Sequence, residues 1–184
     1  TKPLAGQKLT IALSPNFMFF ETVSETDPTG YEGLDIDIIK ELSDRLGFEF
    51  EIVPMSFSSL VGSLQANSVD MVISGMTATE ERKQIVDFSD VYCTSSVGCV
   101  TKADSDINSF EDLQNQIVCC SQGTNYEMMI EDIPGTTLKT YQGQAAVGTA
   151  VAEATDGVAA GLTSINGAKK LATTMLDADG NPML

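Results

Sequence analysis

The strongest constraint on the fold is an alternation of short apolar runs with longer stretches of helical spacing. In the first half of the chain, apolar residues recur every four positions over residues 34–46, which predicts an amphipathic helix. Phe48, Phe50 and Ile52 alternate with acidic residues, which predicts a half-buried strand. The expected elements are strands at 9–13, 48–52 and 69–73, with helices at 34–46 and 60–67 between them. This order predicts parallel strands joined by right-handed helical crossovers, and therefore the α/β class.

The second half repeats this order without evident sequence identity to the first. Its expected elements are strands at 93–101, 117–121, 138–141 and 158–162, with helices opening at 122–124 and running over 144–154 and 164–174. We therefore expect two α/β lobes, residues 1–95 and 96–184, with a ligand cleft between them. Ligands of parallel sheets bind at the carboxyl ends of strands, and the loops at 14–20, 54–57 and 74–77 lie at such ends.

Composition excludes several classes of function. The chain has 26 acidic against 10 basic residues and a formal net charge of −16, whereas nucleic-acid binding needs a basic stripe. It has no histidine, which removes the commonest general base and metal ligand, and its four cysteines fit no zinc spacing. We therefore expect no metal, no cofactor and no catalytic residues. Three of the four cysteines fall in runs that predict strands and are expected to be buried thiols, with a disulfide from Cys99 to Cys119 or Cys120 as the alternative if their strands are neighbours.

The best candidate for a binding site is the stretch at 69–92. After the predicted strand ends at Gly75, the four residues from Thr77 to Glu80 have the form of a capping box, which predicts the start of a helix with Arg82 in its first turn. A helix N-terminus offers unpaired N–H groups, and an arginine offers a planar pair of donors that matches a carboxylate. These residues predict a pocket for a small carboxylate. The alternative is that Thr77 only caps the helix and Arg82 only pairs with a nearby acidic side chain.

Several motifs carry a resemblance to a known family. They are GLDID at 33–37, LQA at 64–66, the run from Val69 to Arg82, VDFSD at 86–90 and SQGT at 121–124. In order and spacing they resemble those of the extracytoplasmic solute-binding proteins of polar amino-acid ABC transporters, and they span nearly the whole chain. The resemblance implies the type II periplasmic-binding-protein fold, in which two α/β lobes close on a ligand. It also implies a monomer that lies outside the cytoplasmic membrane, either in the periplasm or as a cell-surface lipoprotein.

The resemblance further implies that the protein binds an amino acid or a related carboxylate and delivers it to the membrane permease of an ABC transporter. Arg82 of the first lobe would hold the carboxylate of the ligand, and Phe17 and Phe57 would enclose its side chain. The full set of expected ligand contacts is Phe17, Phe57, Ser74, Gly75, Met76, Thr77, Arg82, Gln122, Gly123, Thr124 and Gly161. The alternatives are core packing for the two phenylalanines and a simple strand-to-helix turn for Gly123.

The chain departs from the family pattern at two points. Gly161 stands where the family has an acidic residue that pairs with the ammonium group of the ligand. Either Glu21, Thr163 or Ser164 partly replaces that residue, or the ligand is not a standard α-amino acid, because a buried ammonium without a counter-charge is costly. The chain also ends before the family's return to the first lobe, so we expect the C-terminal part of that lobe to be missing.

Two other functions fit the same scaffold. One is the ligand-sensing domain of a receptor or kinase. The other is an enzyme that resembles prephenate or arogenate dehydratases, which would need an acid or base in the cleft. Glu21 and Glu80 are the only obvious carboxylates near the expected site, so we expect a binding protein and no enzyme.

Overall fold

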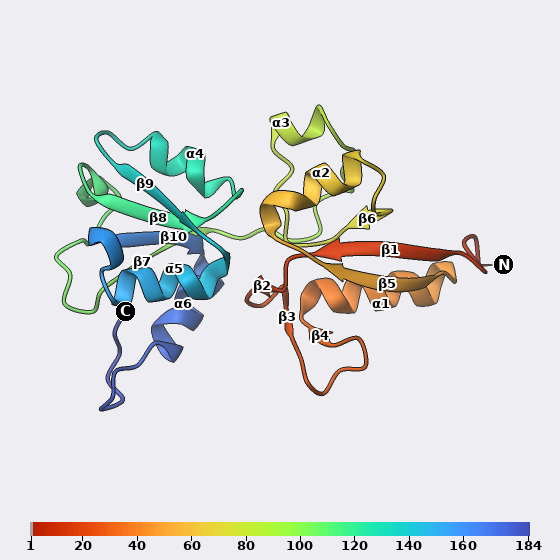
Figure 1. Ribbon diagram of the computed structural model, residues 1–184, viewed down its shortest axis with the longest axis horizontal. Helices are drawn as coiled ribbons and strands as arrows, with labels where there is room; N and C mark the ends of the chain where they lie inside the picture. The colour runs from red at the N-terminus through yellow and green to blue at the C-terminus, as the bar shows by residue number, and fades with distance from the viewer. Residues whose placement is uncertain (1) are drawn as a thin grey trace. The chain divides into compact units, whose positions relative to one another are not determined.

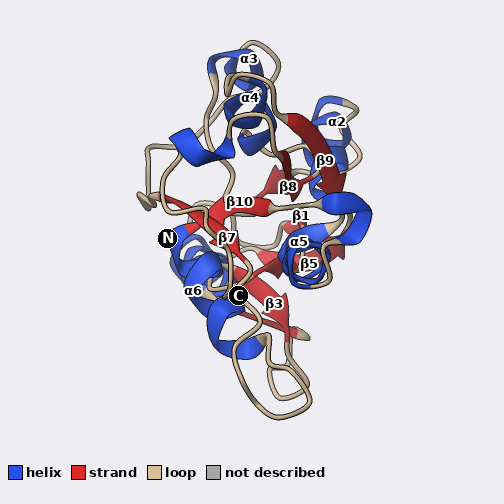
Figure 2. Ribbon diagram, turned by 90° about the vertical axis from the view of Figure 1, so that its left-hand side faces the viewer, coloured by secondary structure: helices blue, strands red, loops and turns tan. Residues whose placement is uncertain are grey.

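The computed structural model describes residues 2–184, which divide into two units, the first ending at Cys93 and the second running over Thr94–Leu184 (Figure 1). Both units combine helices and strands, which are coloured apart in Figure 2. No helix within residues 2–184 has both the length and the apolar character needed to cross a membrane.

The main sheet of the first unit is built around its N-terminal strand. The elements that form it and cross over it are β1 (Lys8–Leu13), α1 (Leu34–Leu46), β5 (Glu49–Pro54), a 3-10 turn (Phe57–Ser59), α2 (Leu60–Gln65) and β6 (Met71–Val72). β1 lies between β5 and β6, and both pairings are parallel. The predicted alternation of parallel strands and helices is therefore confirmed for this unit.

Helix α1 forms where the apolar spacing predicts it. Ile36 and Ile39 are fully buried and belong to the same core cluster as Ile11 of β1. The helix ends at Gly47, which has a φ of 88° and donates its N–H to the carbonyl of Ser43. Glycine adopts this left-handed conformation at the least steric cost, so the residue that ends the helix was readable from the sequence.

A small antiparallel sheet corrects the prediction of a loop without strands at 14–20. β2 (Asn16–Phe17), β3 (Glu21–Val23) and β4 (Tyr31–Glu32) pair in that order. Strands of two or three residues are too short for a period of two to show in the sequence, so their pairing is set by tertiary contacts. Phe17 lies opposite Glu21 in this sheet.

The second unit repeats the strand order of the first. Its elements are β7 (Val97–Thr101), a 3-10 turn (Glu111–Leu113), β8 (Ile117–Ser121), α4 (Tyr126–Glu131), β9 (Thr137–Tyr141), α5 (Gly143–Ala152), a 3-10 turn (Thr155–Gly157), β10 (Ala160–Ser164) and α6 (Ile165–Thr174). The parallel order β9-β8-β10 matches β5-β1-β6. β7 runs antiparallel to β10, and residues 93–96 lie outside it, because the five residues of β10 pair with only five residues of β7.

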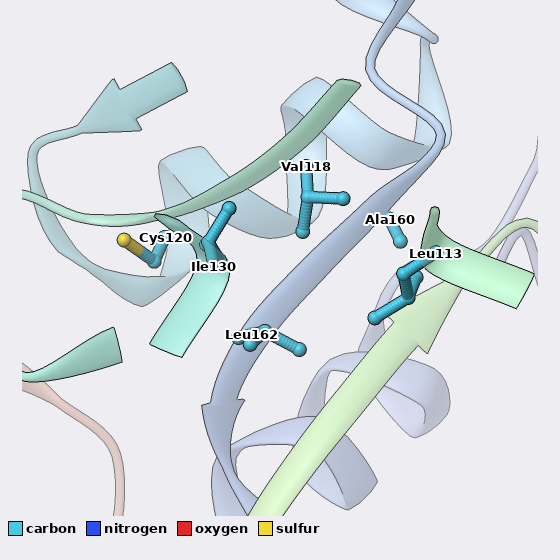
Figure 3. Packing of buried hydrophobic residues seen from close by; sticks show 6 residues of the cluster. All are labelled: Leu113, Val118, Cys120, Ile130, Ala160 and Leu162. Atoms are coloured by element: carbon cyan, nitrogen blue, oxygen red, sulfur yellow. The ribbon is translucent and has the colours of Figure 1, made fainter. Parts of the chain in front are cut away.

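Two helices cover opposite faces of the second sheet. On β8, Val118 and Cys120 pack in one buried cluster with Ile130 of α4 (Figure 3). Cys119 lies between them in the sequence and points to the other face, where its sulfur lies 4.0 Å from the carbonyl oxygen of Val147 in α5. This alternation buries both faces of the central strand.

Cys119 and Cys120 are buried as expected, Cys99 is half-buried, and no disulfide joins cysteines within residues 2–184. β10 lies between the strand of Cys99 and the strand of Cys119 and Cys120, so the alternative of a disulfide between these strands is wrong. Burial raises the pKa of the Cys99 thiol to about 11 and those of Cys119 and Cys120 to about 12, as expected of unreactive thiols. Cys93 is exposed.

The position of Gly161 corrects the predicted bounds of the strand at 158–162. The strand expected at 158–162 lies at Ala160–Ser164, so Gly161 sits inside the strand and not at its carboxyl end. Gly161 is buried, and a Cβ atom there would lie 2.7 Å from Cγ1 of Val147. The glycine therefore allows close packing of α5 on the sheet.

We expect Gly161→Asp to lower the free energy of unfolding by about 3 kcal/mol or more, because it forces Val147 aside and buries a charge. Urea denaturation followed by circular dichroism measures the effect. The matched control is Ala145→Asp, which adds the same side chain at an exposed position in the first turn of α5 and should change stability by less than about 0.5 kcal/mol. Equal effects of the two substitutions would contradict the packing role of Gly161.

Candidate ligand-binding site

The three parallel strands of the first unit end at one edge of their sheet, which we call the carboxyl edge. The loops that follow Leu13, Pro54 and Val72 come together there. The backbone N–H of Ser14 donates to Oγ of Ser74 at 3.0 Å, which joins the first of these loops to the third. The sequence predicted that these loops share an edge, and the parallel pairing confirms it.

Arg82 and Phe57 meet at this edge. The guanidinium carbon of Arg82 lies 5.5 Å from the ring centroid of Phe57, within the range of a cation–π interaction. Nη1 of Arg82 donates to the carbonyl oxygen of Thr77 at 2.8 Å. Burial lowers the pKa of Arg82 from its ordinary value, and Glu81 opposes that shift, but a guanidinium stays charged at neutral pH. The ring and the carbonyl oxygen therefore orient a cationic, planar donor.

The cap of the following helix lies two residues later than predicted. α3 (Glu80–Lys83) has Thr79 as its N-cap, and Oγ1 of Thr79 accepts from the backbone N–H of Arg82 at 3.3 Å. The expected cap, Thr77, is exposed, and its carbonyl oxygen accepts from Thr79 and Arg82. Two threonines in the order Thr-Ala-Thr compete for one capping position, and the local sequence alone does not decide between them. The hydroxyl of Thr77 is therefore not used to cap α3.

The Ser74–Gly75 turn is bonded toward the protein interior. Ser74 is 1% exposed, and its hydroxyl donates to Oε1 of Glu21 while accepting from Ser14. The backbone N–H of Gly75 donates to Oδ2 of Asp35 at 2.6 Å. The expected contact of Gly75 with a ligand stays a prediction, and for this N–H it requires Asp35 to give up the bond. Glu21 is fully buried, which also argues against its proposed role as partner of a ligand ammonium group.

Aromatic rings line the start of the same edge. Phe17 stacks on Phe20 with ring centroids 4.7 Å apart, and Phe20 makes an edge-to-face contact with Phe19 at 5.4 Å. Phe20 is buried, Phe17 is half-buried and Phe19 is 57% exposed. Met76 is half-buried and packs with Phe57 against the core cluster that includes Leu60. Phe17 and Phe57 are thus partly exposed walls of the edge, and their contact with a ligand stays a prediction.

The corresponding loop of the second unit has its backbone donors bonded internally. The N–H groups of Gln122, Gly123 and Thr124 donate to the carbonyl of Tyr141, to the carboxylate of Glu127 and to the carbonyl of Ser121. Gly123 has a φ of +78°, which supports the alternative that it serves a tight turn. The expected contact of these N–H groups with a ligand stays a prediction, and for Gly123 it requires Glu127 to move.

The residues proposed to replace the missing acid are also bonded within the second unit. Oγ1 of Thr163 accepts from Nε2 of Gln144 at 2.7 Å, and Oγ of Ser164 caps α6 by accepting from the N–H of Gly167 at 3.1 Å. Both residues are almost completely buried. The structure therefore gives each of them a role in packing and capping.

Neither unit offers a metal centre in the part that the structure describes. Across residues 2–184, no three carboxylate or thiol side chains come together in a way that could hold a metal ion. The chemistry of the first unit's carboxyl edge is instead that of one cation, a turn and several aromatic rings. Such an arrangement suits the binding of an anionic group beside an apolar one.

Comparison with known proteins finds similarity to bacterial solute-binding proteins. The family described as bacterial extracellular solute-binding proteins, family 3, matches residues 9–178. The arginine-binding extracellular protein ArtP of Bacillus subtilis is 39% identical over 121 residues, which are 66% of this chain and 46% of that protein. The histidine-binding periplasmic protein of Escherichia coli is 30% identical over 142 residues, 75% of this chain and 54% of that protein. The chain thus spans about half the length of these relatives.

Solved structures agree with the sequence matches. The substrate-binding protein of an amino-acid ABC transporter has a TM-score of 0.83 and 32% identity, with 96% of this chain and 81% of that chain covered. The arginine-bound form of a truncated arginine-binding protein from T. maritima has a TM-score of 0.79 and 30% identity, covering 96% and 83%. The ancestral amino-acid-binding protein AncCDT-1, described as a precursor of cyclohexadienyl dehydratase, has a TM-score of 0.80 and 32% identity, covering 91% and 75%. The type II periplasmic-binding-protein fold is confirmed.

We expect Gly75→Ala to lower the free energy of unfolding by about 2 kcal/mol or more. Gly75 has a φ of +52°, and a Cβ atom there would lie 2.4 Å from Cε1 of Phe17, so the substitution adds backbone strain to a steric clash. The matched control is Gly62→Ala in α2, where a Cβ atom meets nothing within 4 Å and alanine favours the helix by up to about 1 kcal/mol. Urea denaturation compares the two, and a Gly75→Ala variant as stable as the starting protein would refute the strained turn.

Proposed function

The chain belongs to the bacterial extracellular solute-binding proteins of family 3, and from this premise we propose that it binds an amino acid through the carboxylate of that ligand. We propose further that it delivers the amino acid to an ABC transporter. The relatives named above are arginine- and histidine-binding proteins, and a glutamine-binding protein of Geobacillus stearothermophilus is 43% identical over 86 residues. These amino acids share an α-carboxylate and differ in their side chains. The proposed site therefore recognises the part that they have in common.

The observation that carries the proposal is the position of Arg82 on the carboxyl edge. Its guanidinium is oriented by the ring of Phe57 and by the carbonyl oxygen of Thr77. A guanidinium with a fixed plane forms two parallel hydrogen bonds with a carboxylate at little further cost in side-chain entropy. Partial burial strengthens the attraction to an anion, because less water competes for the group.

The side chain of the ligand would lie beside the aromatic rings of the same edge. Phe17 and Phe57 are half-buried, so each presents part of its ring to solvent. A flat apolar surface binds the aliphatic stem of an amino acid, and it also attracts a cationic end group through the face of the ring. Further contacts from Gln122, Gly123 and Thr124 belong to the same proposal.

Binding, and not catalysis, is the proposed activity. Glu21, one of the two carboxylates expected near the site, is buried and bonded to Ser74, and no histidine is present in the sequence. General acid–base catalysis needs a proton donor or acceptor that reaches the substrate. We also propose a location outside the cytoplasmic membrane and a permease as partner, which the family match supports.

We expect Arg82→Ala to weaken binding of the preferred amino acid at least tenfold, because a charge-assisted hydrogen bond contributes roughly 1.5–3 kcal/mol. A thermal-shift screen of the standard amino acids first finds the ligand, since a ligand that binds only the folded state raises the melting temperature. Isothermal titration calorimetry then compares the variants. Arg82→Lys should fall between Ala and Arg, because lysine keeps the charge and loses the planar pair of donors.

The control for this experiment is Arg45→Ala. Arg45 lies in the same unit, on the exposed face of α1, where it pairs with Glu41, so its removal should leave binding unchanged. An Arg82→Ala variant with unaltered affinity would refute the role of Arg82. A screen in which no amino acid stabilises the protein would refute amino-acid binding itself.

A further inference from the structure

Two acidic side chains are fully buried beneath the carboxyl edge of the first unit. Glu21 lies in β3 and Asp35 in the first turn of α1, and both residues have 0% exposure. A carboxylate buried without partners is strongly unfavourable, so such groups are paired, bonded or protonated in stable proteins. The proposed binding of an amino acid does not use either group directly.

The hydrogen-bond donors around Asp35 fit its ionised form. The backbone N–H of Gly75 donates to Oδ2 at 2.6 Å, and the hydroxyl of Tyr92 donates to Oδ1 at 2.9 Å. Both oxygens of Asp35 therefore act as acceptors. A neutral carboxyl group would turn one of these acceptors into a donor and lose a bond.

The surroundings of Glu21 fit its neutral form. Oε1 accepts from the hydroxyl of Ser74, whose oxygen in turn accepts from the N–H of Ser14. Oε2 is buried and receives no hydrogen bond from any donor in residues 2–184. A proton on Oε2 would convert this orphan acceptor into a donor toward the neighbouring carboxylate of Asp35, with which Glu21 interacts.

Electrostatics favour the same arrangement. Burial, and then the charge of Asp35, raise the pKa of Glu21 to about 10. Burial also raises the pKa of Asp35, although its bonds from Gly75 and Tyr92 oppose the shift. The pKa of Tyr92 is raised by burial and by Asp35, so its hydroxyl keeps its proton. In the described part of the chain, Glu21 and Asp35 interact with each other and with one further ionisable group, Tyr92. No ion pair joins Glu21 or Asp35 to a cation in residues 2–184.

We propose that Glu21 and Asp35 share a single proton and together act as positioning residues for the ligand-carboxylate site. Glu21 holds the side chain of Ser74, and Asp35 holds the backbone of Gly75. The segment that carries Thr77 and Arg82 begins directly after this turn. The proposal rests on the proposed function, in that it explains how the start of the arginine-bearing segment is fixed to β3 and α1.

Loss of the shared proton would place two negative charges side by side in a buried site. Their repulsion would push the Ser74–Gly75 turn away from β3 and α1, and so displace the segment that follows. Ligand affinity should therefore fall at high pH, in proportion to the fraction of molecules that keep the proton. Near pH 10 that fraction is about one half, so the loss attributable to the pair is about twofold and grows above that pH.

The decisive variant is Glu21→Gln, whose amide copies the protonated acid by accepting from Ser74 and donating to Asp35 without titrating. Calorimetry from pH 6 to pH 10 gives the dissociation constants of the starting protein and the variant for the same amino acid. Their ratio cancels the titration of the ligand itself. We expect this ratio to change by about twofold or more between pH 7 and pH 10, and a constant ratio would overturn the positioning role. Glu25→Gln, at an exposed position between β3 and β4, serves as the control that keeps the profile of the starting protein.

A second measurement needs neither a variant nor a ligand. Carbon-13 NMR of the side-chain carboxyl groups should show one glutamate that titrates far above the others, and the amide proton of Gly75 should shift with the same midpoint. If all glutamates titrate near pH 4.5, the shared proton is refuted. If Glu21 titrates high while the Gly75 amide does not follow, the pair does not position the turn. A protein that binds no amino acid would refute the proposed function, and this titration would still decide the inference.

The shared proton also has a consequence for stability. Glu21 keeps its proton in the folded state and loses it in the unfolded state above its ordinary pKa, so its contribution is fully present below about pH 4.5 and is lost as the pH rises toward 10. Unfolding of the starting protein near pH 7 should therefore release one more proton than unfolding of Glu21→Gln. Parallel pH profiles of stability for the two proteins would contradict the proposal.

Discussion

The parallel pairing of β1 with β5 and β6 is the constraint on which the first unit depends. Parallel neighbours cannot be joined by a hairpin, so each connection must cross the sheet as a helix. The same rule brings all three carboxyl ends to one edge, where the segments after Leu13, Pro54 and Val72 meet. The second unit obeys the same rule with β8 at the centre of β9 and β10. Parallel strand pairing alone therefore brings polar loops together at one edge of the sheet in each unit.

At both edges, most of the polar groups bond to the protein itself. In the first unit, Ser74 and Gly75 bond to Glu21 and Asp35, and in the second unit Gly123 bonds to a carboxylate of its own helix. Buried donors and acceptors must be satisfied, so a loop that forms a precise turn uses its own N–H groups first. The proposed recognition of a ligand therefore falls to side chains that project beyond these turns, above all Arg82.

Glu21 and Asp35, beneath the carboxyl edge of the first unit, illustrate how hydrogen bonds fix the position of a binding loop. Apolar packing sets the approximate position of a turn, whereas hydrogen bonds to Ser74 and Gly75 hold it to within about 0.5 Å. A single shared proton lets Glu21 and Asp35 supply these bonds without two buried charges. Such a pair is stabilising only while it is neutralised by one proton, which links the geometry of the loop to pH.

Sequence alone determined the order of the helices and of the strands of the two main sheets, the carboxyl edge and the candidate role of Arg82, because apolar period, helix-ending glycine and local motifs are properties of neighbouring residues. Tertiary structure decided which contacts and hydrogen bonds form between residues that are far apart in the sequence. It moved the cap from Thr77 to Thr79, placed Gly161 inside a strand against Val147, and bonded Gly75 to Asp35, forty positions away. Pairing register and buried hydrogen bonds depend on which segments meet across the fold, and no local pattern records that choice.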